Sequence, residues 1–448
     1  MPTMPRQPTL PLFASLWIFL AVFLLPMDKA IALRNLVLLL GLGLCLWQWR
    51  QLLPRLRQDA LPRFALGGLT AFIALLLLQT LFFAENRAFS AGAILGEWLG
   101  AALVLGLGMG MALLAGAPRQ AAAQGISMAL LALLTHVLWM LGYQLLPVFS
   151  GQPPRLGLMP FAERDFHSQL VAPLTLLLLA EAVLRKWDLP GLLPWSNRVL
   201  HGALVLALLG VVGVNGRTTL IHIGAGGLLL VAALVLAHPQ RGSGTRRKAV
   251  LGVGIALALL AATSLTLDKR WQKLGDSFAA GLKVQENRTW LDDRRYPLPT
   301  LPSGQEADHS AYLRAAFGTL ALQGIANHPM GIGYSIDAFG RVILLDQGER
   351  TAIISSHSSI LDFTLGTGLL GLAGLTLLVA LGCRGLYRRY RQTGDAAALL
   401  AMLVIASYYL RCFPEGHLSG WRLKLTLLLT GLLLGASLLQ RSRATARR

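Results

Sequence analysis

Long apolar stretches separated by short polar connections run along almost the whole 448-residue chain. A helix needs about 20 predominantly apolar residues to cross a hydrocarbon layer about 30 Å thick. Twelve segments approach that length: 11–27, 31–49, 64–83, 91–115, 121–147, 169–184, 199–214, 219–238, 249–267, 358–382, 396–414 and 421–439. The pattern predicts an all-α polytopic membrane protein with about twelve transmembrane helices. The first segment has no small-residue cleavage pattern before Asp28 and Lys29, so we expect it to be retained.

Two connections are longer than the others, and both are expected on the same side of the membrane. Residues 148–168 form a medium loop and residues 268–357 a long one. Within the long loop, residues 311–327 contain few helix breakers and are expected to be helical, whereas the proline-rich stretch 296–303 cannot be. The chain is thus predicted to comprise helices 1–9 in residues 1–267, a partly helical loop in residues 268–357, and helices 10–12 with a basic tail in residues 358–448.

The charge of the chain fixes an expected orientation. Hydrophobic residues make up 54% of the chain and charged residues 14%, which is not the balance of a soluble domain, although the net charge is +19. The basic residues cluster in three short connections and the tail: Arg50, Arg55, Arg57 and Arg63; Arg246, Arg247 and Lys248; Arg384, Arg388, Arg389 and Arg391; Arg441, Arg443, Arg447 and Arg448. Because cytoplasmic loops carry such residues, the pattern indicates topology and not nucleic-acid binding. Both termini are then cytoplasmic, and the long loop faces outward.

His357 lies where the long loop enters the tenth segment, in the sequence SSHSSILDF. An imidazole titrates near neutral pH and is well suited to act as a general base. The same position also suits a helix cap formed by the histidine and its neighbouring serines. Position alone leaves both interpretations open.

Arginines near the outward face are candidates for holding an anion: Arg164, Arg217, Arg288 and Arg314. Arg217 lies in the short turn between the seventh and eighth segments, and Arg164 lies just before the sixth. Guanidinium groups bind phosphate oxygens in a planar, two-pronged manner and keep their charge, so converging arginines would form a diphosphate site. Taken singly, each is more simply explained as a lipid-headgroup anchor or a surface charge.

Other signals in the chain are weaker. Glu97, His136 and Arg411 lie inside apolar segments, where charged groups usually face a cavity. For Glu97 and Arg411, mutual pairing or reaching toward the membrane surface explains the charge better than chemistry. Asp292 and Asp293 are followed directly by two arginines, so a metal site is not expected. No GxxxxGK[ST] loop is present and no GxGxxG stands between a strand and a helix, so we expect neither a nucleotide nor another cofactor.

Several motifs resemble the O-antigen ligases of lipopolysaccharide assembly, within the larger group that includes O-antigen polymerases and bacterial protein O-oligosaccharyltransferases. The ligase pattern is His, then Asn, Ser or Gln, nine further residues and Gly-x-x-Gly, and it is matched by His357, Ser358, Gly368 and Gly371. The stretch HPMGIGYSIDAF, residues 328–339, is similar to the proline and glycine stretch of the group; its glycines let the backbone turn sharply and approach a ligand. Arg314 resembles an arginine usual upstream, and Arg217 falls at the group's outward arginine after the seventh helix.

The resemblance implies a membrane-type glycosyltransferase with a GT-C-like fold, in the bacterial inner membrane, with its active site facing the periplasm. It would transfer O-antigen glycan from undecaprenyl diphosphate to the lipid A-core oligosaccharide, with inversion and without a cofactor or nucleotide. His357 would be the general base. Arg217, together with Arg164, Arg288 and Arg314, would hold the diphosphate and stabilise it as it departs.

Two alternatives remain. A polymerase or a protein O-oligosaccharyltransferase would share this chemistry and differ in its acceptor. A transporter of polyprenyl-linked glycan would be expected to place charges and broken helices at the bilayer midplane. The charged and aromatic residues here crowd the outward loop instead, so transport ranks below transfer.

Overall fold

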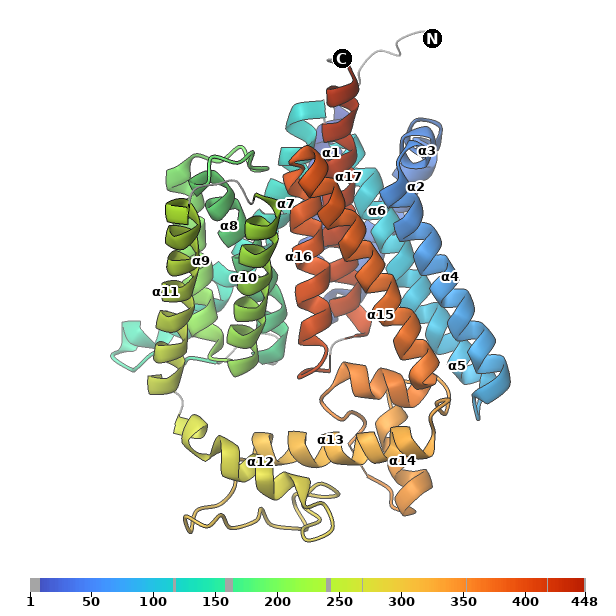
Figure 1. The fold of residues 1–448 in the computed structure, drawn as a ribbon, viewed down its shortest axis with the longest axis vertical. Coiled ribbons are helices and arrows are strands. Elements are labelled where there is room, and N and C mark those ends of the chain that lie inside the picture. The colour runs from blue at the N-terminus through green and yellow to red at the C-terminus, as the bar shows by residue number, and fades with distance from the viewer. Residues whose placement is uncertain are drawn as a thin grey trace.

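The computed structural model describes residues 9–115, 118–157, 164–238, 243–267, 269–351, 353–416 and 418–446. Within these residues the regular structure is helical, apart from an isolated β-bridge between Thr300 and Glu306. Long helices run side by side, and shorter helices lie across one end of them (Figure 1). The predicted all-α polytopic membrane fold is therefore confirmed.

Each of the predicted apolar segments is helical. The long helices are α1 (Thr9–Leu24), α2 (Ile31–Trp47), α4 (Ala60–Phe83), α5 (Arg87–Ile94) continued through a π-helical turn (Leu95–Leu99) into α6 (Gly100–Leu114), α7 (Pro118–Leu145), α8 (Arg164–Lys186), α9 (Asn197–Val214), α10 (Arg217–Ala237), α11 (Ser243–Leu267), α15 (Ser359–Thr393), α16 (Ala396–Arg411) and α17 (Gly420–Ala446). In the described part of the chain, nine helical spans are long and apolar enough to cross a membrane, and α1 and α16 are shorter apolar helices. A count of twelve crossings stays a prediction.

The long loop folds into a layer of its own. It contains a 3-10 turn (Lys269–Lys273), α12 (Leu274–Leu282), α13 (His309–Asn327) and α14 (Ala338–Gln347). The helix expected in residues 311–327 is thus confirmed as α13, and the proline-rich stretch 296–303, between α12 and α13, is not helical, as predicted. Trp290, Tyr312, Phe317 and Phe339 belong to a separate apolar cluster under this layer. The loop is therefore a packed structure and not a tether.

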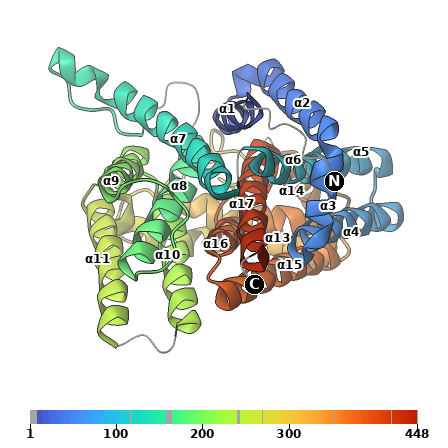
Figure 2. The same ribbon diagram turned by 90° about the horizontal axis from the view of Figure 1, so that it is seen from above.

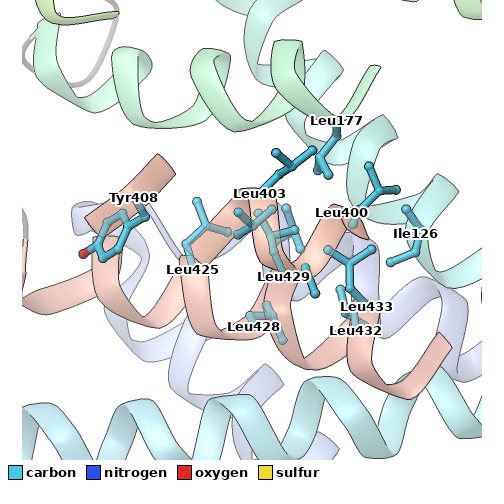
Figure 3. Close-up of a cluster of buried hydrophobic side chains, with 14 of the residues drawn as sticks. Ile126, Leu177, Leu400, Leu403, Tyr408, Leu425, Leu428, Leu429, Leu432 and Leu433 are labelled. Carbon is cyan, nitrogen blue, oxygen red and sulfur yellow. The ribbon is translucent and has the colours of Figure 1, made fainter. Parts of the chain in front are cut away.

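The centre of the bundle is formed by α16 and α17, which lie between the α8–α10 group and the α4–α6 group (Figure 2). Leucines of α16 and α17 pack there against α7 and α8 (Figure 3). Glycines let α17 approach α6 closely, because a Cβ on Gly108 would lie 2.6 Å from the Leu428 oxygen and one on Gly435 would lie 2.7 Å from the Met109 oxygen. In lipid, close packing of this kind drives helix association, since apolar side chains gain little by leaving acyl chains.

The two ends of the bundle differ in charge. α15 begins beside the loop layer and ends in a basic turn at the opposite end (Figure 1). At that opposite end Arg389 binds Asp395 at 2.9 Å and Asp59 at 2.6 Å. Asp59 directly follows α3 (Trp49–Gln58), which carries Arg50, Arg55 and Arg57 of the first basic cluster. The basic connections of α3 and α15 therefore lie away from the α12–α14 layer.

Candidate functional site

Helix α13 contacts or carries three of the predicted site residues. Its capping residue Asp308 binds Arg217, its second turn carries Arg314, and Phe317 packs on His357. At a rise of about 1.5 Å per residue, the nine steps from Asp308 to Phe317 correspond to about 14 Å along the helix axis. Residues that are far apart in the sequence are thus brought to one helix at the membrane-facing side of the loop layer.

Arg217 is the first residue of α10 and follows a tight turn. Asn215 has a positive φ of 48°, which ends α9, and Gly216 leads directly into the new helix. The Nη2 atom of Arg217 lies 3.4 Å from Oδ1 of Asp308, and the two side chains are only 9% and 8% exposed. The guanidinium carbon also lies 5.5 Å from the ring centre of Trp271, a favourable cation–π geometry. The cation is therefore fixed in place between a carboxylate and an indole.

Arg314 is the more accessible of the two arginines. Its Nη2 atom lies 3.4 Å from Oε1 of Glu415, and its side chain is 34% exposed whereas that of Glu415 is 4% exposed. The Arg314 side chain is therefore partly accessible to a further anionic group.

His357 is held in an uncommon backbone conformation by the turn around it. Its φ is +60°, in the left-handed region that a residue with a Cβ adopts at a cost. Its N–H donates to Oγ of Ser355 at 3.1 Å, and that hydroxyl donates to Asp362 at 2.7 Å. The backbone N–H of Ser356 donates to the same carboxylate at 2.9 Å. Asp362, one turn inside α15, thus fixes the turn that presents the imidazole.

The imidazole itself is exposed, and its ring stacks on that of Phe317. Its ring lies 5.9 Å from that of Phe317 at an interplanar angle of 24°, a stacked arrangement. The cap of α15 is formed by Ser358, whose hydroxyl accepts from the N–H of Leu361 at 3.4 Å. The capping role considered for His357 is therefore taken by its neighbour, and the histidine side chain faces outward.

The other two predicted arginines are Arg288 and Arg164. Arg288 pairs with Glu349 at 3.3 Å in a surface contact, with side chains 57% and 45% exposed. Beside it, the Tyr312 hydroxyl donates to the Asn287 oxygen at 3.1 Å; burial raises the pKa of Tyr312, so this phenol remains a donor. The backbone of Arg164 begins α8, but its side chain lies outside the described part of the structure.

The proline and glycine stretch before the histidine forms hydrogen bonds with the backbone of α15. The N–H groups of Ile332 and Gly333 donate to the Leu365 and Gly366 oxygens at 3.0 and 2.9 Å. These carbonyls are free because α15 breaks at Gly368, which has a φ of +64°. A Cβ on Gly331 would collide with the backbone nitrogen of Gly368. The close approach expected here is therefore made between two parts of the chain.

Sequence reasoning undervalued two charged residues near the site. Glu415, in the sequence FPEG of the connection between α16 and α17, was not singled out, although an acid in a short loop between apolar helices was a usable signal. Arg411 was expected to reach the surface or to pair with Glu97. It is instead 2% exposed and bonds Ser168 and His222, while Glu97 accepts from the N–H of Gly420 at 2.7 Å.

The fold and this cluster define a multi-pass membrane protein that gathers cationic side chains and an imidazole on a helical layer at one end of its bundle. The family described as O-antigen ligase matches residues 202–376. The match runs from α9 through the Gly-x-x-Gly of α15 and includes Arg217, Arg288, Arg314 and His357. The resemblance to the O-antigen ligase superfamily is thus confirmed over this stretch. No curated protein matches the chain.

Proposed function

We propose that the protein is an O-antigen ligase, which transfers O-antigen glycan from undecaprenyl diphosphate to the lipid A-core oligosaccharide. The family match supports a glycosyltransferase-like enzyme of O-antigen assembly. The observation that carries the finer proposal is the placement of Arg217, Arg314 and His357 around α13. This arrangement combines a base with cations suited to a diphosphate.

In the proposed reaction, the imidazole of His357 takes the proton of an acceptor hydroxyl. The hydroxyl oxygen attacks the anomeric carbon of the donor, and the bond from that carbon to the diphosphate oxygen breaks on the opposite face. The electron pair leaves with undecaprenyl diphosphate, and the configuration is inverted. Arg217 and Arg314 stabilise the charge that develops on the departing group, and the proton on His357 is released to solvent.

The carboxylates beside the arginines prepare the site for this charge. Asp308 and Glu415 are each less than a tenth exposed and hold a guanidinium at 3.4 Å. A pair at this separation is loose for a charge-assisted hydrogen bond, for which about 2.7–2.9 Å is usual. A diphosphate bearing two or more negative charges can therefore share these cations without the arginines having to move far.

The membrane orientation is also part of the proposal. Basic connections lie at the end opposite the α12–α14 layer, so the positive-inside rule places that layer and the site in the periplasm. The termini are then cytoplasmic and the membrane is the bacterial inner membrane. An apolar cavity of about 120 Å³ between α4, α15, α16 and α17, lined by Leu375, Leu378 and Leu427 and bordered by Leu418 near the start of α15, is a suitable place for part of the polyprenyl chain.

The role of His357 is tested with the purified His357→Ala variant in detergent or liposomes. We expect it to bind undecaprenyl diphosphate-linked glycan with the affinity of the unchanged protein but to lose transfer to lipid A-core by at least about 100-fold, the usual range for general-base catalysis. The matched control is His309→Ala, because His309 is exposed in the same loop and pairs with Asp293 at 2.9 Å. Full transfer by His357→Ala would overturn the proposal.

The acceptor that the protein uses distinguishes a ligase from a polymerase or a protein O-oligosaccharyltransferase. The unchanged protein is given the lipid-linked donor with lipid A-core, with a second lipid-linked glycan, or with a serine-containing acceptor protein. Transfer to lipid A-core supports the ligase, and exclusive transfer to either other acceptor would assign a polymerase or a protein O-oligosaccharyltransferase. Movement of the donor across liposomes without any transfer would favour a transporter.

A further inference from the structure

The end of α16 and the turn after it contact both halves of the candidate site. We call this segment, residues 411–416 with Leu418, the α16–α17 clasp. On the side of His357, the backbone oxygens of Cys412 and Glu415 accept from the N–H groups of Ile360 and Ser359 at 3.1 and 2.9 Å. The Ser359 hydroxyl accepts from the N–H of Leu418 at 2.7 Å. The clasp thus fixes the first turn of α15, directly after His357.

On the other side, the clasp reaches the start of α10 through one side chain. Nη1 of Arg411 donates to the backbone oxygen of Ser168 at 3.0 Å and lies 3.2 Å from Nδ1 of His222, while Nη2 donates to the Ser168 hydroxyl. That hydroxyl lies 2.7 Å from the hydroxyl of Thr219. Thr219 is two residues after Arg217 in the first turn of α10. One guanidinium therefore joins α16 to α8 and α10 just beneath Arg217.

The burial of Arg411 makes this link costly and rigid. Arg411, Ser168 and Thr219 are 2%, 1% and 0% exposed, and a charge inside a membrane helix is retained only where neighbouring groups or a function compensate it. The planar fork of arginine binds several acceptors in fixed directions, which lysine cannot do. A link of this kind sets the distance between two helices more strictly than apolar packing does.

We propose that Arg411 is a positioning residue, which sets the place of Arg217 relative to the His357 turn through the α16–α17 clasp. The proposal rests on the function proposed above, because it assigns Arg217 and His357 to one reaction. It goes beyond that function by giving a residue outside the diphosphate site a part in transfer. A displacement of about 1 Å between reacting groups costs up to about 100-fold in rate, so loosening this link should be visible in kcat.

A double-mutant comparison separates positioning from general destabilisation. We expect Arg411→Met to lower kcat by roughly 10- to 100-fold, and Arg411→Lys to restore little of it. We expect Arg217→Lys to keep residual activity, because lysine retains the positive charge. In this background we expect Arg411→Met to cost less than about threefold, because coupled sites are not additive. Equal costs in both backgrounds would overturn the proposal.

The matched control is Arg389→Met. Arg389 is also an arginine that joins helices and is largely shielded, with its side chain 11% exposed, but it lies at the other end of the bundle, where it binds Asp59 and Asp395. We expect Arg389→Met to lower thermal stability. Its effect on kcat should be the same in the unchanged protein and in the Arg217→Lys background. Coupling of Arg389→Met to Arg217 as strong as that of Arg411→Met would also overturn the proposal.

A measurement without activity keeps the proposal separate from the proposed function. By hydrogen–deuterium exchange with mass spectrometry, Arg411→Met is expected to raise amide exchange severalfold in both residues 216–222 and 355–361, whereas Arg389→Met leaves both unchanged. Unchanged exchange in either segment would refute positioning by Arg411. If the unchanged protein proved unable to transfer glycan but showed this exchange pattern, the proposed function would fail while the structural link would stand.

Discussion

Each of the three clustered site residues has a partner that restricts its position in the structure described here. Arg217 lies between Asp308 and Trp271, Arg314 is paired with Glu415, and His357 is stacked on Phe317. Preorganised charges cost no rearrangement when charge develops in a transition state. At this scale, catalysis should therefore depend on the partners as well as on the residues that touch substrate.

The stacking partner of His357 provides a direct test. Phe317→Leu keeps an apolar side chain in a site that is 1% exposed but removes the aromatic face beneath the imidazole. Aromatic stacking contributes about 0.5–1.5 kcal/mol, so kcat for glycan transfer should fall by roughly 2- to 10-fold as the imidazole gains freedom.

The control is Phe339→Leu, since Phe339 is also 1% exposed and packs edge-on against Phe317 with ring centres 5.3 Å apart. It should lower the melting temperature in detergent by a similar amount and leave kcat nearly unchanged. A larger kcat loss in Phe339→Leu than in Phe317→Leu would show that core packing, and not the stack, governs the rate.

The sequence indicated some of these residues and concealed others for a physical reason. Arg217 and His357 were recognisable because each stands at a boundary between an apolar segment and a polar connection. Asp308 and Phe317 gave no comparable signal, because their importance arises only when α13 lies across the bundle and meets α10 and α15. Glu415 offered only its place in a short polar connection, which does not reveal that it pairs with Arg314 of α13. The expectation for Arg288 came from charge alone, which does not distinguish a binding residue from its surface pair with Glu349.

At the scale of elements, α15 combines a membrane span with a docking site for the chain before it. Hydropathy predicted a helical span in residues 358–382, but the helix breaks at Gly368. Ile332 and Gly333 donate to the backbone oxygens of Leu365 and Gly366 that the break leaves available. Gln79 of α4 donates to the Met330 oxygen at 3.1 Å and also to the Thr367 oxygen. Periodicity cannot reveal such a break, because the apolar composition continues through it.

The glycines of this contact should be intolerant of any side chain. Gly331→Ala and Gly368→Ala each place a Cβ against backbone at a φ of +77° or +64°. We expect each to destabilise the protein by about 1–3 kcal/mol, in line with the cost of strained backbone, measured as a lower thermal melting point in detergent.

Gly318→Ala in α13 is the comparison, because nothing lies within 4 Å of a Cβ at that helical position. This variant should be neutral or more stable by up to about 1 kcal/mol, the propensity difference between the two residues. A Gly331→Ala variant as stable as Gly318→Ala would mean that residues 329–333 do not dock on α15 as described.

For the whole molecule, hydropathy predicted the all-α membrane fold well, since lipid requires that spanning backbone be helical or closed into a barrel. The arrangement of the helices was not predictable, because it depends on close contacts such as those between α6 and α17. Charge placement predicts an orientation, and the structure adds that the basic connections of α3 and α15 lie opposite the α12–α14 layer. That separation allows the orientation to be tested with two exposed positions.

Gln305 lies exposed in the long loop and Gln58 lies exposed at the end of α3, so Gln305→Cys and Gln58→Cys form a matched pair once Cys45, Cys383 and Cys412 are replaced by alanine. In intact spheroplasts a membrane-impermeant maleimide should label Gln305→Cys at once and Gln58→Cys only after permeabilisation. The reason is that the basic residues Arg50, Arg55, Arg57 and Arg63 predict a cytoplasmic location for the α3 end. Transfer to lipid A-core must be retained in the cysteine-free parent for the result to apply. Labelling in the reverse order would put α13, Arg217 and His357 on the cytoplasmic side, where they could not meet a periplasmic acceptor, and the proposed ligase reaction would have to be abandoned.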